Sequence, residues 1–523
     1  MVIGMESAKE SERSPAPRRP TPHGPAPQGP TPRRPTPRRP VPRRPSLRRV
    51  VLASLAGSVV LGGFAVLLPR YVPRDTPPPA PGPVARAMTA AGAGVPAALP
   101  DLVALIGDRE AYLRAHPRSP EAAQTWALLG AAYVERGQRT SDSAFFPKAD
   151  QALRASLKVR QQRNPDALNG LAALAGARHD FTAAKKWGEE AVRLAPKRWT
   201  SYPALIDAYT GLGDVKAAGR SLETLVTLRT GTVALTQAGQ VYRERGWRED
   251  AATTLSDAAA LARTPAEEAL CLHRAGDLAW ERGDPAAALR FYDTALRADP
   301  DRHETVAARA RALAALGRTQ DAVRAYKTAQ AKRSAPEYAL ELGELYESQR
   351  MDAQARTEYD RVRSRVRERA ADGVEDGLLL GLFEADHGDP EVAVQGLRAE
   401  WKRVGSGRAA DALAWALHRA GNDKEALEFA RKAAEKGPRT ALASYHRAEI
   451  ERALGDEGGA RRHLDEALRT NPYFSPLLAP RARDEREALG DAPPGGPEEV
   501  EAPPGAPVEL PTPAPRPKPP AKR

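Results

Sequence analysis

Cysteine is nearly absent from this 523-residue chain, because Cys271 is the only one. An intramolecular disulfide and a cysteine-based metal site are therefore excluded. The nine histidines are spread singly, and the sequence has no Gly-x-x-x-x-Gly-Lys phosphate loop, His-Glu-x-x-His metal motif or Gly-x-Ser-x-Gly nucleophile motif. Cys271 and His273 are two residues apart, which on a helix points them to different faces. We therefore expect no enzymatic activity, no cofactor and no bound metal.

The net charge of +12 is not spread evenly over the chain. Residues 1–49 carry twelve Lys and Arg against three Glu, whereas residues 98–488 are almost neutral. A basic face broad enough to neutralise many phosphates is not expected in that body, so nucleic acid is not a favoured partner. The 49 prolines concentrate at the two ends, which predicts disorder over residues 1–49 and 489–523.

One long apolar run is present, Val50–Leu68, and it is bounded by Arg48–Arg49 and Arg70. As a helix this run would be about 28 Å long, which matches the hydrocarbon core of a bilayer. We predict a single transmembrane helix over residues 50–69 that acts as a signal-anchor. Because the basic flank precedes it, the N-terminus is expected in the cytoplasm and the body outside, as in a single-pass protein of the cell membrane.

Other interpretations of the N-terminal part stay open. An export signal could be cleaved at Ala85-Arg86-Ala87, and Arg48–Arg49 resembles a twin-arginine signal, although Leu47 stands where Ser or Thr is usual. The Pro/Arg-rich segment before the span could bind anionic lipid headgroups or nucleic acid, and residues 70–97 are predicted to be a linker. A stripe of small residues in the span indicates either a homodimer face or only an Ala/Gly-rich composition: Ser54, Ser58 and Gly62.

Residue types recur at intervals of 34 positions along the body of the chain. Gly283 and Gly317 are separated by this interval, as are Gly421 and Gly455. A repeat of this length is typical of one helix–turn–helix unit copied many times. A single copy cannot bury its own apolar face, so neighbouring copies must stack into an extended helical array.

The repeated pattern resembles the tetratricopeptide repeat family over roughly residues 98–488. Trp126, Leu129, Gly130 and Tyr133 form the first-helix signature Trp-x-x-Leu-Gly-x-x-Tyr. The second-helix pattern, Ala-x-x-x-aromatic-x-x-Ala ending in Pro, follows at Ala288, Tyr292, Ala295 and Pro300. The resemblance implies an all-α, right-handed superhelical solenoid of about ten helical hairpins with end caps, and a bacterial membrane-anchored member of the family.

Small residues have two expected roles in these units. Those in the first helix should let the two helices of a unit approach closely: Gly130, Ala172, Gly239, Gly276, Gly343, Gly381 and Ala414. Glycines at the helix–helix turn should adopt positive φ: Gly137, Gly213, Gly246, Gly283, Gly317, Gly388, Gly421 and Gly455. Two stretches depart from the repeat. The lengthened first turn, with Phe145 and Phe146, is expected to cap the first layer, and the charged stretch Val362–Asp376 is expected to lengthen a helix.

The family resemblance also implies a function. In tetratricopeptide proteins the first helices line a concave surface that receives a peptide or helix of another protein. We therefore expect a membrane-tethered protein–protein interaction scaffold. Trp280 and Trp415 are the best candidate anchors, and the alternative for either is packing between layers. Some members capture a C-terminal carboxylate with a Lys/Asn/Arg clamp, which is not reproduced here because the matching places hold Asp277, Arg311, Glu344 and Glu449. The positions implied to face a ligand are Thr236, Gln240, His273, Asp277, Trp280, Arg311, Glu344, Glu347, Trp415 and His418.

Overall fold

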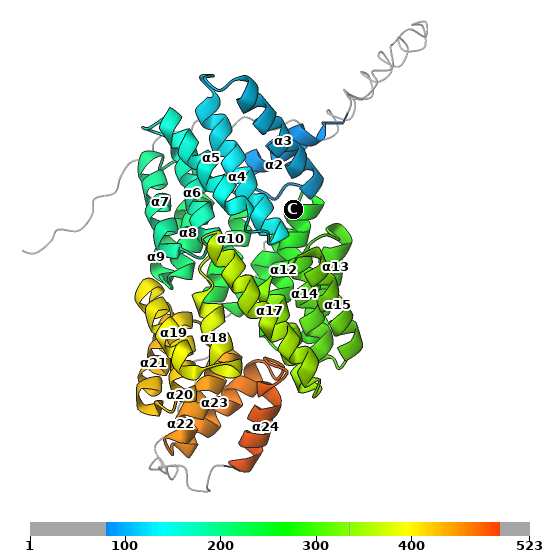
Figure 1. Cartoon of the computed structure of the whole chain (residues 1–523), viewed down its shortest axis with the longest axis vertical. Coiled ribbons are helices and arrows are strands. Elements are labelled where there is room, and N and C mark those ends of the chain that lie inside the picture. The colour runs from blue at the N-terminus through cyan, green and yellow to red at the C-terminus, as the bar shows by residue number, and fades with distance from the viewer. Residues whose placement is uncertain (1–79, 334, 492–523) are drawn as a thin grey trace, which may run out of the picture. The chain divides into compact units, whose positions relative to one another are not determined.

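The computed structural model describes residues 80–333 and 335–491, which form helices and no strand (Figure 1). No helix in these ranges is long and apolar enough to cross a membrane. The predicted span over residues 50–69, the segment before it and the tail from residue 492 lie outside the described residues. The helices are α2 (Pro83–Ala93), α3 (Leu99–Ala115), α4 (Ala122–Thr140), α5 (Phe145–Val159), α6 (Pro165–Ala177), α7 (Phe181–Leu194), the 3-10 turn η1 (Trp199–Ser201), α8 (Tyr202–Gly211), α9 (Val215–Leu228), α10 (Thr232–Glu244), α11 (Arg248–Leu261), α12 (Pro265–Glu281), α13 (Pro285–Ala298), α14 (His303–Ala315), α15 (Thr319–Lys332), α16 (Pro336–Ser348), α17 (Asp352–Ala371), α18 (Gly377–His387), α19 (Pro390–Val404), α20 (Gly407–Arg419), α21 (Asp423–Lys436), α22 (Ala441–Ala453), α23 (Glu457–Thr470) and α24 (Leu478–Ala488).

The helices from α4 to α23 pair consecutively into ten hairpins, and each hairpin packs on the next. Within a pair the first and second helices share the most extensive contact, as between α12 and α13 or between α20 and α21. This arrangement confirms the all-α hairpin solenoid that the repeat predicted. A run of α2 and α3 precedes the first hairpin, and α24 follows the last one (Figure 1).

Glycines in the first helices bring the two helices of a hairpin together, as predicted. A Cβ atom placed on Gly343 would lie 2.4 Å from Cε1 of Tyr359, and one on Gly276 would lie 2.4 Å from Cε1 of Tyr292. The aromatic ring of the second helix therefore fills the space that a first-helix side chain would need. Aliphatic side chains fill the same space in other hairpins: Leu153 opposite Gly130, Leu255 opposite Gly239 and Leu397 opposite Gly381.

Most of the turn glycines also behave as predicted. Positive φ is found at Gly213, Gly246, Gly283, Gly317, Gly421 and Gly455. The prediction was wrong at Gly137, which lies inside α4 against Phe146, and at Gly388, where φ is −139°. In three other turns a residue with a side chain takes positive φ, which costs more than it would for glycine: Ser141, His179 and Arg350.

The two irregular stretches have structural roles. Phe146 is buried in the core of the first layer, and the ring of Phe145 stacks on Tyr133 at a centroid distance of 6.2 Å. The charged stretch lengthens a helix, because α17 has 20 residues and ends at Ala371. Both expectations are confirmed.

The predicted linker over residues 70–97 was wrong in its second half, where α2 forms. Pro83 occupies the first turn of α2, and Gly94 ends the helix with a φ of 71°. Ala87 and Ala90 are buried in the same core as α3 and α4. A stretch rich in alanine and proline reads as a spacer, but alanine has the highest helix propensity and proline is compatible with a first turn.

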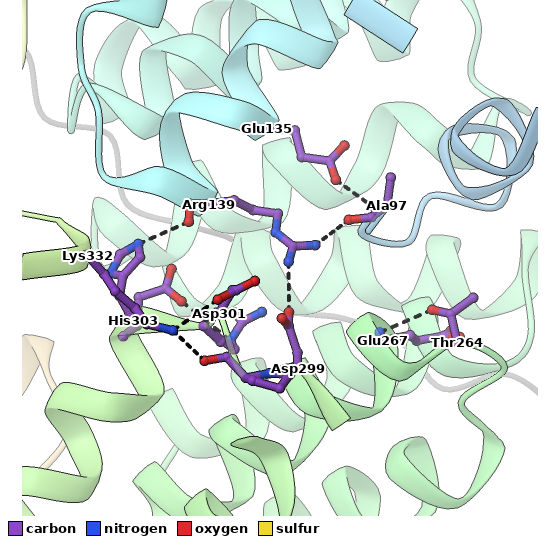
Figure 2. A network of polar contacts seen from close by, with 12 residues as sticks. Ala97, Glu135, Arg139, Thr264, Glu267, Asp299, Asp301, His303 and Lys332 are labelled. Atoms are coloured by element: carbon purple, nitrogen blue, oxygen red, sulfur yellow. Dashed lines mark hydrogen bonds and ion pairs between the residues drawn. The ribbon is translucent and has the colours of Figure 1, made fainter. Parts of the chain in front are cut away.

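Hairpins far apart in the sequence touch along a line of contacts that we call the seam. On one side are the turns within the early hairpins, and on the other are the connections between later hairpins. Arg139, next to the first turn, forms an ion pair with Asp299 at 2.7 Å, and Figure 2 shows it reaching between Asp299 and the carbonyl of Ala97. His303 Nε2 lies 3.0 Å from the carbonyl oxygen of Arg139. Burial lowers the pKa of His303, which favours its neutral form.

The seam continues along later hairpins with the same pairing of turn and connection. The amide of Glu375 donates to the carbonyl of Arg178 at 2.8 Å, and Arg403 donates to the carbonyl of His179 at 3.0 Å. Arg408 and Glu244 form an ion pair at 2.6 Å, and the side-chain amide of Asn471 donates to the backbone carbonyl of Trp280 at 2.9 Å. The seam thus joins the first five hairpins to the last five.

A carboxyl pair makes the C-terminal cap sensitive to pH. Glu449 on α22 is buried and bonded to Arg452 at 2.6 Å, and Glu485 on α24 lies 4.0 Å from the same arginine. Burial, followed by a hydrogen bond with Glu449, raises the pKa of Glu485 from 4.5 to about 7, although Arg452 and Arg481 oppose the shift. The protonated form is therefore the one that fits the folded state.

We expect Glu485→Gln to stabilise the protein increasingly as the pH rises from 4.5 to about 7, and to a constant extent above that. A raised folded-state pKa gives stability that is present below pH 4.5 and lost as the pH rises through about 7. The variant should match the wild type at pH 4 and exceed its unfolding free energy by about 1 kcal/mol at pH 8, a value kept small because Glu485 is only partly buried. Thermal unfolding at both pH values measures this. An equal difference at the two pH values would contradict the ionisation argument.

Candidate ligand surface

Eight of the ten residues predicted to face a ligand lie on the first helices of hairpins from α12 onward. His273, Asp277 and Trp280 are on α12 and Arg311 is on α14, whereas the others lie on α16 and α20. Two further positions on α10, Thr236 and Gln240, are buried and half-buried. The structure brings the predicted residues together in two groups. One group runs over α12 to α16, and the other lies around Trp415 and His418.

The first group is tied by ion pairs and aromatic contacts. His273 Nε2 lies 3.4 Å from a carboxylate oxygen of Asp277, and the guanidinium of Arg311 lies 5.6 Å from the ring centroid of Trp280. Glu344 and Glu347 both approach His387, at 3.7 and 3.4 Å. Arg311 also forms an ion pair with Glu341 at 3.4 Å, so this row of charges is largely paired within the protein.

Tyrosines on the second helices hold the carboxylates of this row. Tyr292 donates to Asp277 at 2.8 Å, and Tyr359 donates to Glu347 at 2.6 Å. Burial raises the pKa of Asp277, but His273 and Arg311 outweigh it and the net direction is down. Burial also raises the pKa of Glu344, against the opposing effect of His387. The row is thus a set of coupled buried charges whose orientation is fixed by packing.

The two candidate tryptophans differ in their surroundings. The ring of Trp415 is 2% exposed, stacks on His446 at 4.3 Å and donates to Asp386 at 2.9 Å. It packs between hairpins and is covered on both sides by the protein itself. Trp280 is 8% exposed, but it lines a cleft beside Arg311. Of the two, Trp280 is the one that borders a space that a ligand could enter.

That space is a cleft of about 750 Å³, which we call the arginine cleft. Trp280 and Phe474 supply aromatic surface, and the connection between α21 and α22 forms the opposite wall. Its charged lining has six arginines against three glutamates: Arg243, Arg245, Arg248, Arg311, Arg408 and Arg439 against Glu244, Glu281 and Glu466. The cleft therefore has an excess of positive charge.

Ion pairs use only part of this positive charge. Two nitrogens of Arg243 donate to the carboxylate of Glu281, one of them at 2.8 Å. Burial lowers the pKa of Arg243, but Glu281 raises it by more, so the net direction is upward. Within the described residues Arg245 and Arg248 form no ion pair; Arg245 stacks on Trp247 and Arg248 donates to a backbone carbonyl. These two guanidinium groups retain their charge for an outside partner.

Sequence reasoning missed most of the arginine cleft. Its two walls come from hairpins that meet only across the seam, so Arg408 and Arg439 carry no local pattern that links them to Arg243. The one signal available was the run of arginines around the turn at Gly246. Charge clustered at a helix–helix turn is usually a solvated face, and it gave no reason to choose this turn.

Cys271 and His273, the two residues considered as a nucleophile and a base, contact different neighbours. Cys271 is fully buried, burial raises the pKa of its thiol, and its sulfur lies 3.5 Å from the hydroxyl of Thr236. His273 points elsewhere, toward Asp277 and Thr305. Across residues 80–333 and 335–491, no three His, Cys, Asp or Glu side chains are grouped to hold a metal ion.

Comparison with known proteins identifies the repeat. A family model described as tetratricopeptide repeat matches residues 279–340, from the end of α12 into α16. No curated protein sequence matches the chain. The predicted resemblance thus has independent support in the central hairpins.

Several solved structures resemble this chain at low identity and low TM-score. TTC0263, a tetratricopeptide repeat protein of Thermus thermophilus, is 23% identical, with 36% of this chain and 98% of that chain covered and a TM-score of 0.31. Yeast Tom70 is 13% identical, with 70% and 96% covered and a TM-score of 0.32. The human IFIT1 dimer with PPP-AAAA is 16% identical, with 74% and 86% covered and a TM-score of 0.42. Over residues 279–340 the chain is similar to the tetratricopeptide repeat, and the ten hairpins have the helix–turn–helix form expected of such repeats.

Proposed function

We propose that this protein is a membrane-tethered interaction scaffold whose arginine cleft holds a peptide or helix of a partner protein. The observation that carries the proposal is the cleft itself, where Trp280 lies beside Arg311 and shares the lining with Arg245 and Arg248. Aromatic and arginine side chains contribute most of the binding energy in protein interfaces. Proteins of this repeat family generally mediate protein–protein interactions, which is consistent with such a role.

The charge of the cleft indicates the chemistry of the bound segment. Six arginines against three glutamates favour a segment with carboxylates, which Arg245 and Arg248 can bind through two hydrogen bonds each. The ring of Trp280 and that of Phe474 favour an apolar side chain beside those carboxylates. An acidic, partly apolar segment of a partner is therefore the best fit.

The proposed tether rests on the sequence. The apolar run over residues 50–69 and the basic segment before it favour an N-terminus in the cytoplasm and a repeat body outside. Protease added to intact cells should then digest the body. In untreated cells the protein should be recovered at full length in the membrane fraction. A shortened protein recovered from the medium would instead favour the exported, cleaved form.

The partner proposal predicts a specific loss of binding. After crosslinking in cells, the full-length wild type should capture a partner that Trp280→Ala and Arg248→Ala capture at least tenfold less, because each removes an anchor of the cleft. Quantitative mass spectrometry of the captured proteins measures this loss. The matched variants Trp187→Ala on α7 and Arg297→Ala on α13 lie away from the cleft and should capture it normally. Retention of every partner by both cleft variants would refute the assignment.

A further inference from the structure

A second cavity lies under the N-terminal helices, apart from the arginine cleft. It has a volume of about 840 Å³ and is enclosed by α2, α3, the first turns of α10 and α12, and the connection after α13. We call it the N-terminal cavity. Its volume falls in the range of pockets that hold small molecules.

The seam holds this cavity together. The backbone amide of Ala97 donates to the carboxylate of Glu135 at 2.8 Å. The guanidinium of Arg139 donates to the carbonyl of Ala97 and also pairs with Asp299 (Figure 2). On the other side, Arg86 on α2 binds Asp101 on α3 with two hydrogen bonds of 2.8 and 2.6 Å. These contacts position α2 and the following loop over the ends of α10 and α12.

Most of the uncharged lining is apolar. Alanines and prolines of α2, α3 and their connecting loop face Val233, Ala266 and Leu261. Leu261 is 55% exposed, which is high for a large apolar side chain, and it lies at the edge of the cavity. An apolar group placed there would cover Leu261 and remove apolar surface from water.

The charged lining pairs off within the protein, apart from two arginines. Asp101, Asp299 and Asp301 are each bound by a basic side chain, the last by Lys332 at 3.0 Å. The carboxylate of Glu267 accepts the amide of Arg263 at 2.7 Å and so caps the start of α12. In the described part of the chain Arg229 and Arg263 form no ion pair, and Gly231 leaves the start of α10 without a side-chain cap. Among the described lining residues, the guanidinium groups without an ion pair are therefore those of Arg229 and Arg263, and the remaining carboxylate of the lining, that of Glu267, is bound to a backbone amide.

We propose that the N-terminal cavity binds a small amphipathic anion, namely an alkyl chain that ends in a single carboxylate or phosphate. The chain would lie along the alanines, Val233 and Leu261, and the anionic end would lie toward Arg229, Arg263 and the first turn of α10. This ligand class is independent of the partner protein, because the cavity and the arginine cleft share no lining residue among those described.

Photolabelling of the full-length protein tests the proposal. The probe is a twelve-carbon carboxylic acid that carries a diazirine on its chain, and labelled peptides are mapped by mass spectrometry after irradiation. We expect saturable labelling within residues 83–101 and 229–267. Unlabelled dodecanoate or dodecyl phosphate should compete at least tenfold better than dodecanol, because the alcohol lacks the charge. The two anionic competitors also separate a carboxylate from a phosphate as the better head group.

Variants at exposed positions keep the test independent of folding. Leu261→Glu places a negative charge at the edge of the cavity and should reduce labelling at least tenfold. Val392→Glu is the matched control, because Val392 is 52% exposed on α19 and should label normally. Labelling spread evenly along the chain, equal competition by dodecanol, or equal labelling of the two variants would overturn the proposal. Loss of partner capture in the cleft variants would not affect it.

Discussion

Replacement of Gly343 by leucine is expected to lower the free energy of unfolding by about 1–3 kcal/mol. The added side chain would meet the ring of Tyr359, which already lies 2.4 Å from an ideal Cβ position. Neither α16 nor α17 can move away freely, because both pack on neighbouring hairpins. Overpacking of this kind forces side chains from their preferred rotamers and shifts the backbone. Chemical denaturation followed by circular dichroism measures the loss.

A matched glycine gives the opposite sign. Gly396 lies in α19 and is exposed, and no heavy atom of the described residues lies within 4 Å of an added Cβ. Gly396→Leu should therefore stabilise the protein by about 0.5–1 kcal/mol through helix propensity alone. If Gly343→Leu had the same effect as Gly396→Leu, the close approach of α16 and α17 would be wrong.

Replacement of Arg139 by methionine is expected to open the seam at its first contact, at a cost of about 3 kcal/mol. Arg139 and Asp299 are each 12% exposed, so the change leaves a largely buried carboxylate without its partner. The carbonyl of Ala97 loses a donor in the same step. Hydrogen exchange should report the opening, with amides near Ala97 and His303 exchanging roughly a hundredfold faster.

A solvent-exposed ion pair serves as the control for this prediction. Arg193 and Glu190 lie on the outer face of α7 with 67% and 39% of their side chains exposed. Arg193→Met should leave hydrogen exchange unchanged, because exposed pairs contribute little. Unchanged exchange near Ala97 in Arg139→Met would show that the seam does not depend on this contact.

Local and repeated features of the fold were predictable from the sequence. Gly276, Gly343 and Gly381 each stand 16 residues before the side chain that covers them, so a single hairpin pattern locates these three contacts. The turn glycines follow for the same reason, since positive φ strongly favours glycine. Where His179 and Arg350 take that conformation instead, the pattern carries no sign of it.

Contacts between distant hairpins were not predictable from one sequence. Arg139 and Asp299 are 160 residues apart, and an arginine followed much later by an aspartate has no distinguishing pattern. The same holds for the walls of the arginine cleft, which meet only across the seam. The curvature of a solenoid comes from small rotations between hairpins, and these add up to a contact that no single hairpin encodes.

The seam also restricts how this gene can change length. In most solenoids a unit touches only its neighbours, so copies can be duplicated or deleted with little effect elsewhere. Here an extra unit placed between Arg139 and Asp299 would move every later connection out of register with the turn it meets. The seam therefore constrains the number of units between these two positions as a whole. Relatives that retain the seam should keep the same number of units between these two positions, and variation should be confined to the ends.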